Sequence, residues 1–257
     1  MKTSILNKVV IVLVLSTIIL TGCSGFAGSQ PTNTPSVVRV ATDATYPPFE
    51  TVDETTKGLV GFDIDLINAV AEEAGLQIEL VNVGFDPLLT GIAQCQYDAA
   101  IAAISISDDR AKQMSFSNSY INAGQIVTIN KATTDIQGPD DLVGKKIGVQ
   151  LGTTGAIEAE KIAIAEVQAY DTVDLAFQDL VNKQVDAVVA DYPTSLAFVQ
   201  VNSNDIVTVG DVFTDESYGI AVCKTNTDLL NKINDGLAKV QAKGLIQELE
   251  QKWLAGD

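Results

Sequence analysis

The sequence contains no histidine, and its 16 lysine and arginine residues are outnumbered by 33 aspartate and glutamate residues. Because histidine is the usual general base near neutral pH and the commonest metal ligand, its absence disfavours hydrolytic and zinc-dependent functions. The formal net charge of −17 argues against nucleic acid and anionic lipid surfaces as partners. It adds a bias toward cationic ligands, although a solubilising acidic surface is the plainer interpretation.

The apolar run near the N-terminus is too short to span a bilayer. Lys2 and Lys8 precede this run, which covers residues 9–20 and has the proportions of a signal peptide. We therefore expect residues 1–22 to be a signal peptide that is removed. Without Lys2 and Lys8 the net charge changes from −17 to −19.

The end of this run bears a possible site of lipid attachment. Residues 20–23 read LTGC and resemble the lipobox of bacterial lipoproteins, so Cys23 is expected to carry a lipid. The alternative is a signal peptide that happens to contain a cysteine. Residues 23–36 are expected to form the lipidated cysteine and a flexible tether, because they are rich in Gly, Ser, Thr and Pro.

Cysteine is scarce, with three residues in the chain. If Cys23 carries lipid, Cys95 and Cys223 remain, an even number in an oxidising compartment. Cys95 lies just before an apolar run, and Cys223 ends residues 218–223, which could run beside it in the opposite direction. The two could form a disulfide or remain as two buried thiols.

Two similar segments dominate the rest of the chain, residues 97–110 and 185–193. Each has an Asp-Ala start, a short apolar run and a polar exit. Such runs are typical of strands buried on both faces of a parallel α/β sheet, and ligands bind at the carboxyl ends of these strands. One strand is expected to deliver Arg110 and the other Asp191. A guanidinium can bind a carboxylate and a carboxylate can bind an ammonium, so facing strand ends would bind a zwitterion such as a free α-amino acid.

The repeat extends beyond these two strands. Each half of the chain opens with a strand and a polar loop, at residues 37–45 and 146–155. Turn and periodicity signals then predict the same βαβαβ order twice. The expected elements are a helix over 61–74 ended by Gly75, a strand over 77–83 and a helix over 87–94, then a helix over 156–165, a strand over 168–170, a helix over 172–182 and a strand over 186–189. Residues 227–254 are expected to form two amphipathic helices.

This repeat favours two lobes. We expect lobe 1 to comprise residues 37–119 plus 219–257, and lobe 2 to comprise residues 125–213. The two crossings between the lobes, at 120–124 and 214–218, would act as hinges. Short paired crossings allow lobes to close around a ligand.

Several motifs resemble a known family over nearly the whole chain from Val37. They are residues 41–50 (ATDATYPPFE), 61–66 (GFDIDL), 104–110 (ISISDDR) with Phe116 and Ser117, and 151–155 (LGTTG). In order and spacing they resemble the periplasmic amino-acid-binding proteins of polar-amino-acid ABC transporters, bacterial solute-binding protein family 3. The resemblance implies the α/β periplasmic-binding-protein fold of type II, with two lobes, each a mixed, mostly parallel sheet flanked by helices. It also implies ligand capture between the lobes and delivery to a membrane permease.

The resemblance assigns roles at the amino-acid backbone. Arg110 would bind the ligand carboxylate, helped by the hydroxyl and backbone N–H of Thr154. Asp191, the Ala103 carbonyl and the Ser105 hydroxyl would bind the ammonium. From the residues alone, Arg110 could instead form a surface ion pair, Asp191 could be a turn residue before Pro193, and Thr154 could be an ordinary helix N-cap.

The family pattern assigns side-chain selectivity to Asp43, Tyr46, Phe85 and Gln150. Tyr46 and Phe85 would sandwich the ligand side chain, or could belong to the core. Asp43 would face the distal group, and because a buried Asp without a cation is costly, a cationic ligand would supply its partner. Glutamine-specific relatives have Lys where this chain has Gln150 and His where it has Ala190.

The sequence therefore predicts a monomeric, exported lipoprotein without cofactor or metal at the outer face of the cytoplasmic membrane. It would capture a basic L-amino acid, with arginine favoured, for an ABC transporter permease. Alternatives are a glutamine-specific binder or a periplasmic dehydratase of the cyclohexadienyl type, with Glu50 or Asp43 as acid or base. A receptor's sensory module would normally need a further membrane span and signalling domain.

Overall fold

The computed structural model describes residues 37–255. The expected signal peptide, Cys23 and the tether lie outside the described residues. Within residues 37–255, no helix combines the length and hydrophobicity that crossing a membrane requires.

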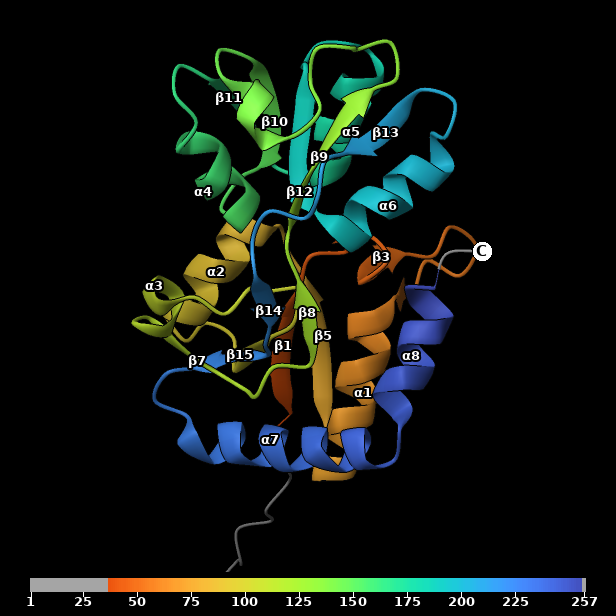
Figure 1. The fold of residues 1–257 in the computed structure, drawn as a ribbon. Coiled ribbons are helices and arrows are strands. Elements are labelled where there is room, and N and C mark those ends of the chain that lie inside the picture. Colours follow the sequence, from red (N-terminus) through yellow and green to blue (C-terminus); the bar gives the residue numbers. More distant parts are fainter. Residues whose placement is uncertain (1–36, 256–257) are drawn as a thin grey trace, which may run out of the picture. The chain divides into compact units, whose positions relative to one another are not determined.

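The chain folds into two α/β lobes, each built on a five-stranded sheet (Figure 1). The first sheet has the order β5-β1-β6-β15-β7. Its strands are β1 (Val38–Thr42), β5 (Ile78–Asn82), β6 (Ala99–Ala100), β7 (Met114–Phe116) and β15 (Ala221–Cys223). β1 pairs in parallel with β5 and β6, whereas β15 is antiparallel to β6 and β7.

The second sheet repeats this plan with the order β11-β10-β12-β9-β13. Its strands are β9 (Gln125–Asn130), β10 (Lys146–Gln150), β11 (Glu166–Tyr170), β12 (Ala187–Asp191) and β13 (Ile206–Val209). β10 pairs in parallel with β11 and β12, and β9 is antiparallel to β12. The predicted repeat and the mixed character of the sheets are confirmed. The sheets are not mostly parallel as predicted, because two of the four strand pairings in each sheet are antiparallel.

Two chain segments connect the lobes and pair with each other. They are β8 (Ile121–Ala123) and β14 (Glu216–Tyr218), antiparallel strands in which Ile121 is opposite Tyr218. Figure 1 shows both between the upper and lower sheets. They lie inside the predicted hinges 120–124 and 214–218, and the lobe limits given above stay a prediction.

Helices cover both sheets. In chain order they are α1 (Phe62–Ala74), α2 (Phe85–Ala93), α3 (Asp108–Ala111), the 3-10 helix η1 (Pro139–Leu142), α4 (Thr154–Glu160), α5 (Val173–Val181), α6 (Tyr192–Val201), α7 (Thr227–Ala242) and α8 (Leu245–Trp253). A small sheet of β2 (Thr45–Tyr46), β3 (Glu50–Val52) and β4 (Leu59–Val60) lies beside α1. As predicted, α1 ends at Gly75, which adopts a left-handed conformation (φ 65°).

Three helices differ from the sequence prediction. α4 covers residues 154–160 rather than 156–165, because Thr153 caps its N-terminus by accepting a hydrogen bond from the Ala156 N–H. α6 was not predicted, although Pro193 lies in its first turn, where proline fits. Arg110 does not leave the sheet directly from a strand, because β6 ends at Ala100 and Arg110 lies on α3.

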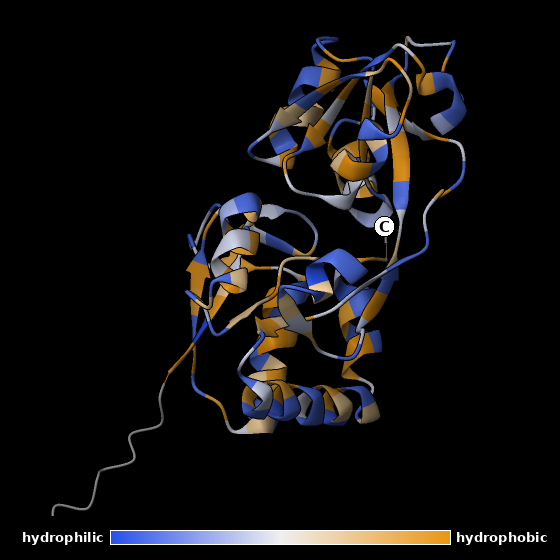
Figure 2. Ribbon diagram, turned by 90° about the vertical axis from the view of Figure 1, so that its left-hand side faces the viewer, coloured by the Kyte–Doolittle hydropathy of each residue, from blue (hydrophilic) through white to orange (hydrophobic). Residues whose placement is uncertain are grey.

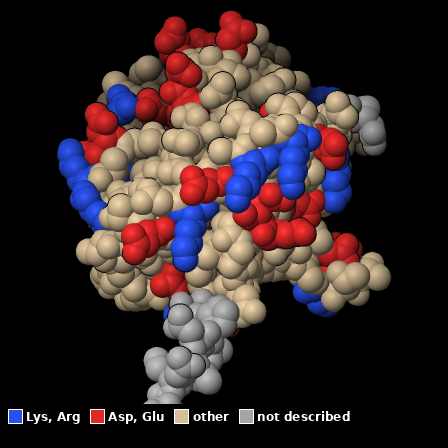
Figure 3. Space-filling model, turned by 90° about the horizontal axis from the view of Figure 1, so that it is seen from below, with Lys and Arg blue, Asp and Glu red and all other residues tan. Residues whose placement is uncertain are grey.

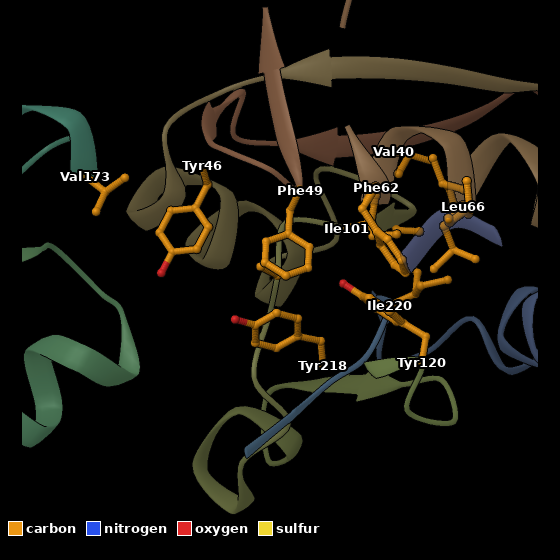
Figure 4. Close-up of a cluster of buried hydrophobic side chains, with 14 of the residues drawn as sticks. Val40, Tyr46, Phe49, Phe62, Leu66, Ile101, Tyr120, Val173, Tyr218 and Ile220 are labelled. Atoms are coloured by element: carbon orange, nitrogen blue, oxygen red, sulfur yellow. The ribbon is translucent and has the colours of Figure 1, made fainter. Parts of the chain in front are cut away.

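Hydrophobic residues concentrate along the strands and on the helix faces that cover them (Figure 2). Near the hinge the core is aromatic: Phe49 makes edge contacts with Phe62 and Tyr218, and Phe62 stacks on Tyr120 (Figure 4). Tyr120 and Tyr218 belong to the two crossings between the lobes. The core of the first lobe therefore continues directly into the hinge.

Two further contacts tie the first lobe together. Cys95 and Cys223 form a disulfide that links the segment before β6 to β15. Seen from below (Figure 3), basic and acidic side chains lie side by side. Lys239 of α7 donates to the Glu73 carbonyl of α1, and Lys243, directly after α7, forms an ion pair with the Glu73 carboxylate. The C-terminal part of the chain is thus fixed to the N-terminal part of the same lobe.

Candidate ligand-binding site

A small, partly enclosed cavity lies between the two lobes. Eight of the nine predicted ligand residues line it. Its lining is Tyr46, Phe85, Ala102, Ala103, Ser105 and Arg110 from the first lobe, with Gln150, Thr153, Thr154 and Asp191 from the second. The ninth predicted residue, Asp43, does not line the cavity.

Arg110 forms one end of the cavity. Its guanidinium donates to the Ser105 carbonyl (2.9 Å) and to the Gly152 carbonyl across the cleft (3.0 Å), and it lies 5.5 Å from the centre of the Phe85 ring. Burial lowers the pKa of Arg110, while the charges of Asp191 and Glu216 counteract this. Arginine stays protonated in proteins, so this end of the cavity carries a positive charge suited to a carboxylate. The structure therefore does not place Arg110 in a surface ion pair.

Asp191 supplies the opposite charge. It is the last residue of β12, is 3% exposed, and accepts a hydrogen bond from the Tyr46 hydroxyl at 2.5 Å. Burial raises its pKa to about 6, with a further contribution from the charge of Glu216. Its side chain makes no N-cap bond to α6. It is therefore an ionisable group of the cavity, available to an ammonium, rather than a turn residue alone.

The Asp63 carboxylate binds the backbone of the loop that carries Ala103. The Ala103 N–H donates to Asp63 at 2.7 Å, and the Tyr120 hydroxyl donates to the same oxygen at 2.9 Å. Ala103 has a φ of 47°, which is unfavourable for a residue with a Cβ atom. Asp63 therefore helps to keep this loop in its unusual conformation and links it to the hinge.

Gln150 separates Asp43 from the predicted ligand position. Asp43 is 2% exposed and accepts hydrogen bonds from Gln150 (2.7 Å) and Thr45 (2.9 Å). Burial raises the pKa of Asp43, and these hydrogen bonds oppose the shift. In this arrangement the neutral Gln150 amide lies where the prediction places a cationic partner of Asp43, and the contact of Asp43 with a ligand stays a prediction.

Several hydrogen bonds cross the cleft directly. Among them are those that join Tyr46 to Asp191, Asp43 to Gln150, and Arg110 to the Gly152 carbonyl. Each joins a residue of the first lobe to one of the second. The structure is consequently a closed arrangement of the two lobes.

Sequence reasoning missed two polar residues at the hinge end of the site, Gln125 and Glu216. The Gln125 amide nitrogen lies 3.1 Å from acceptor atoms of Asp191, Thr154 and Glu216. Glu216 also accepts a hydrogen bond from the Thr154 hydroxyl at 2.7 Å. Their position at the predicted crossings is the signal that could have drawn attention to them. Within residues 37–255, no cluster of three or more acidic or cysteine side chains is arranged to hold a metal ion.

The model for bacterial extracellular solute-binding proteins, family 3, matches residues 38–256. The chain belongs to this family. Its relatives include the L-cystine-binding protein TcyJ of Escherichia coli (strain K12), 31% identical over 220 residues that cover 85% of this chain and 82% of TcyJ. ABC transporter arginine-binding protein 1 of the same organism is 34% identical over 223 residues, covering 84% and 90% of the two chains.

A solved structure of an ancestral arginine-binding protein bound to arginine superimposes with a TM-score of 0.82 at 40% identity, covering 85% of this chain and 98% of that chain. The predicted family and the two-lobed type II fold are both confirmed. This family 3 protein is an extracellular solute-binding protein.

Proposed function

We propose that this family 3 protein captures a free polar L-amino acid in the interlobe cavity and delivers it to the permease of an ABC transporter. The observation that carries the proposal is the placement of Arg110 and Asp191 in one cavity, on opposite lobes. An α-amino acid carries a carboxylate, which suits Arg110, and an ammonium, which suits Asp191, both attached to the same carbon atom. The relatives named above, which bind cystine and arginine by name, share this chemistry.

The ligand's side chain is proposed to be basic, with arginine favoured over lysine. Asp43 accepts hydrogen bonds from neutral groups, namely the side chains of Thr45 and Gln150 and the backbone of Phe85, and the neighbouring charge that raises its pKa is that of Asp174. A guanidinium that displaces or joins Gln150 would give this buried carboxylate a cation. Tyr46 and Phe85 both line the cavity, so their aromatic rings would lie beside the planar guanidinium of a bound arginine. Glutamine is the second candidate, because its amide can bind Gln150.

Binding rather than catalysis fits the site. The named relatives are binding proteins, and the residues that a zwitterion needs are all present in the cavity. A dehydratase would need an acid or base at the reacting atom, whereas Glu50 and Asp43 do not line the cavity. We further propose that Cys23 anchors the mature protein to the membrane by a lipid, that the protein is a monomer, and that closure of the lobes is the signal for the permease.

Calorimetric titration of the refolded protein with arginine, lysine, histidine and glutamine tests this function. Refolding removes ligand carried over from expression. We expect binding of arginine with a Kd of about 1 μM or lower. A preference for glutamine would overturn the basic-ligand assignment, and absence of binding to all four would overturn amino-acid capture.

Asp43→Asn tests the charge complementarity separately. The substitution keeps the shape but removes the charge, so it should weaken arginine at least about tenfold more than glutamine. Asp140→Asn makes the same change at an exposed residue of η1, outside the cavity lining, and should leave both affinities unchanged. Equal losses for arginine and glutamine in Asp43→Asn would contradict the assignment.

A further inference from the structure

Glu216 lies on the hinge strand β14, and its carboxylate is bonded to the second lobe. One oxygen accepts the Thr154 hydroxyl at 2.7 Å; the other accepts the Thr214 hydroxyl at 2.7 Å and lies 3.1 Å from the Gln125 amide nitrogen. Burial raises the pKa of Glu216, but hydrogen bonds, with those from Ser105 and Thr154 foremost, outweigh it and lower the pKa overall. Glu216 is therefore an ionised acceptor at neutral pH.

This bond fixes the direction of the Thr154 hydroxyl. A hydroxyl has one hydrogen and two lone pairs, and the hydrogen of Thr154 is used by Glu216. The Ser105 oxygen lies 3.4 Å from the Thr154 oxygen. The Ser105 hydroxyl gives its own hydrogen to Glu216, so neither oxygen needs to donate across this 3.4 Å contact. Both hydroxyls thus direct their hydrogens away from a ligand. The Gln125 amide nitrogen donates to one lone pair of Thr154, which leaves the other lone pair of Thr154 and those of Ser105 available.

The Ser105 and Thr154 hydroxyls lie at the cavity, so their lone pairs can accept hydrogen bonds from a ligand. Ser105 and Thr154 both line the cavity, together with Asp191. An oxygen that can only accept a hydrogen bond attracts an ammonium and repels a carboxylate. The family resemblance assigns the Thr154 hydroxyl to the ligand carboxylate, but its hydrogen is already bonded.

We propose that Glu216 is a positioning residue that makes the Ser105 and Thr154 hydroxyls acceptors for the ligand's α-ammonium, beside Asp191. This inference rests on the proposed capture of an α-amino acid. Arg110 is then the side chain that binds the carboxylate, and the Thr154 hydroxyl belongs to the cationic end of the ligand.

The backbone around Glu216 connects this role to closure. The Ile106 N–H donates to the Ser217 carbonyl (2.8 Å), and Ser105 forms a β-bridge with Tyr218. The strand is thus attached to the first lobe, whereas the Glu216 side chain holds Thr154 of the second. The two hydroxyls come together as acceptors when the lobes are closed.

Two probes that differ in one group test the proposal. Arginine carries the α-ammonium, and 5-guanidinopentanoic acid is the same molecule without it. Displacement calorimetry with both probes should show that Glu216→Gln weakens arginine at least about tenfold and the analogue less than about threefold. The amide presents N–H groups to the hydroxyls, so at least one hydroxyl must reverse. Glu79→Gln, an exposed position on β5, should change neither affinity.

Thr154→Val supplies an independent measurement that keeps the side-chain shape. It should also weaken arginine selectively, and the double variant with Glu216→Gln should bind arginine within about threefold of Thr154→Val alone. Equal losses of both probes in either single variant would overturn the role of Glu216, as would additive losses in the double variant. If the unmodified protein binds neither probe, the basic-ligand assignment is overturned. If it binds none of the four amino acids of the calorimetric titration, the proposed function itself is overturned, and this inference with it.

Discussion

Replacing the buried Glu50 by glutamine should stabilise the protein, and increasingly so as the pH rises. Glu50 is fully buried at the start of β3, and no hydrogen-bond donor among residues 37–255 reaches either of its carboxyl oxygens. Burial raises the pKa of Glu50 well above its ordinary value of 4.5, and the charges of Asp63 and Asp43 raise it further. Burial also raises the pKa of Asp63 to about 7. In the folded protein Glu50 therefore keeps its proton to a higher pH than in the unfolded chain.

The size of the effect follows from proton linkage. In the unfolded chain Glu50 is ionised above its ordinary pKa of 4.5, so folding must take up a proton. The folded state then binds more protons than the unfolded state, and stability is lost as the pH rises. Between pH 4.5 and the raised pKa of the folded state, the penalty grows by about 1.4 kcal/mol per pH unit. Glutamine is neutral in both states, so Glu50→Gln removes the penalty.

Urea unfolding of the ligand-free protein, followed by circular dichroism from about pH 4.5 to 7.5, measures this difference. The stability of Glu50→Gln relative to the unmodified protein should be near zero at the acidic end and rise steadily toward neutral pH. Glu54→Gln, an exposed position on the following turn, should show no such slope. A difference that does not change with pH, or that falls as pH rises, would refute the assignment of a protonated Glu50.

Three further predictions concern the site and the disulfide. Arg110→Ala should weaken binding of the amino acid by about 2–5 kcal/mol, or about thirtyfold to several thousandfold; a calorimetric loss below about threefold would remove Arg110 from the site. Because Asp191 has a pKa of about 6, raised by burial, and binds an ammonium only when ionised, affinity should fall by up to about tenfold per pH unit below that value; Asp191→Asn should abolish this dependence, and its persistence in the variant would assign it elsewhere. The disulfide closes a sequence separation of 128 residues, so replacing Cys95 and Cys223 by serine should lower the free energy of unfolding by about 2–5 kcal/mol, measured in urea; an unchanged value would contradict the stabilising role.

The regular part of the fold could be predicted because its signals are local. Apolar runs with Asp-Ala starts identify β6 and β12, and Gly75 marks the end of α1 through its left-handed conformation. Signals that depend on context were less informative. A turn at Asp191 before Pro193 was one alternative, but Pro193 lies in the first turn of α6, where its ring is compatible with the helix.

The site was harder to predict where side chains meet across the lobes. The resemblance to the family named eight cavity residues correctly as neighbours, because the strand ends converge. Sequence spacing could not show that Gln150 binds Asp43, 107 residues away, or that Thr154 binds Glu216, 62 residues away. These contacts form because the lobes are closed in the structure, and the spacing of residues along the sequence does not show how the lobes meet.

The place of β15 in the first sheet sets an order of assembly during synthesis. β15 lies between β6 and β7, yet it comes from residues 221–223, after all the strands of the second sheet. The second sheet uses one continuous stretch of chain and can form as soon as residue 209 has emerged. The first sheet lacks its strand between β6 and β7 until more than four-fifths of the 257 residues have been made. A newly made chain therefore keeps its N-terminal lobe incomplete until most of its residues are available to fold.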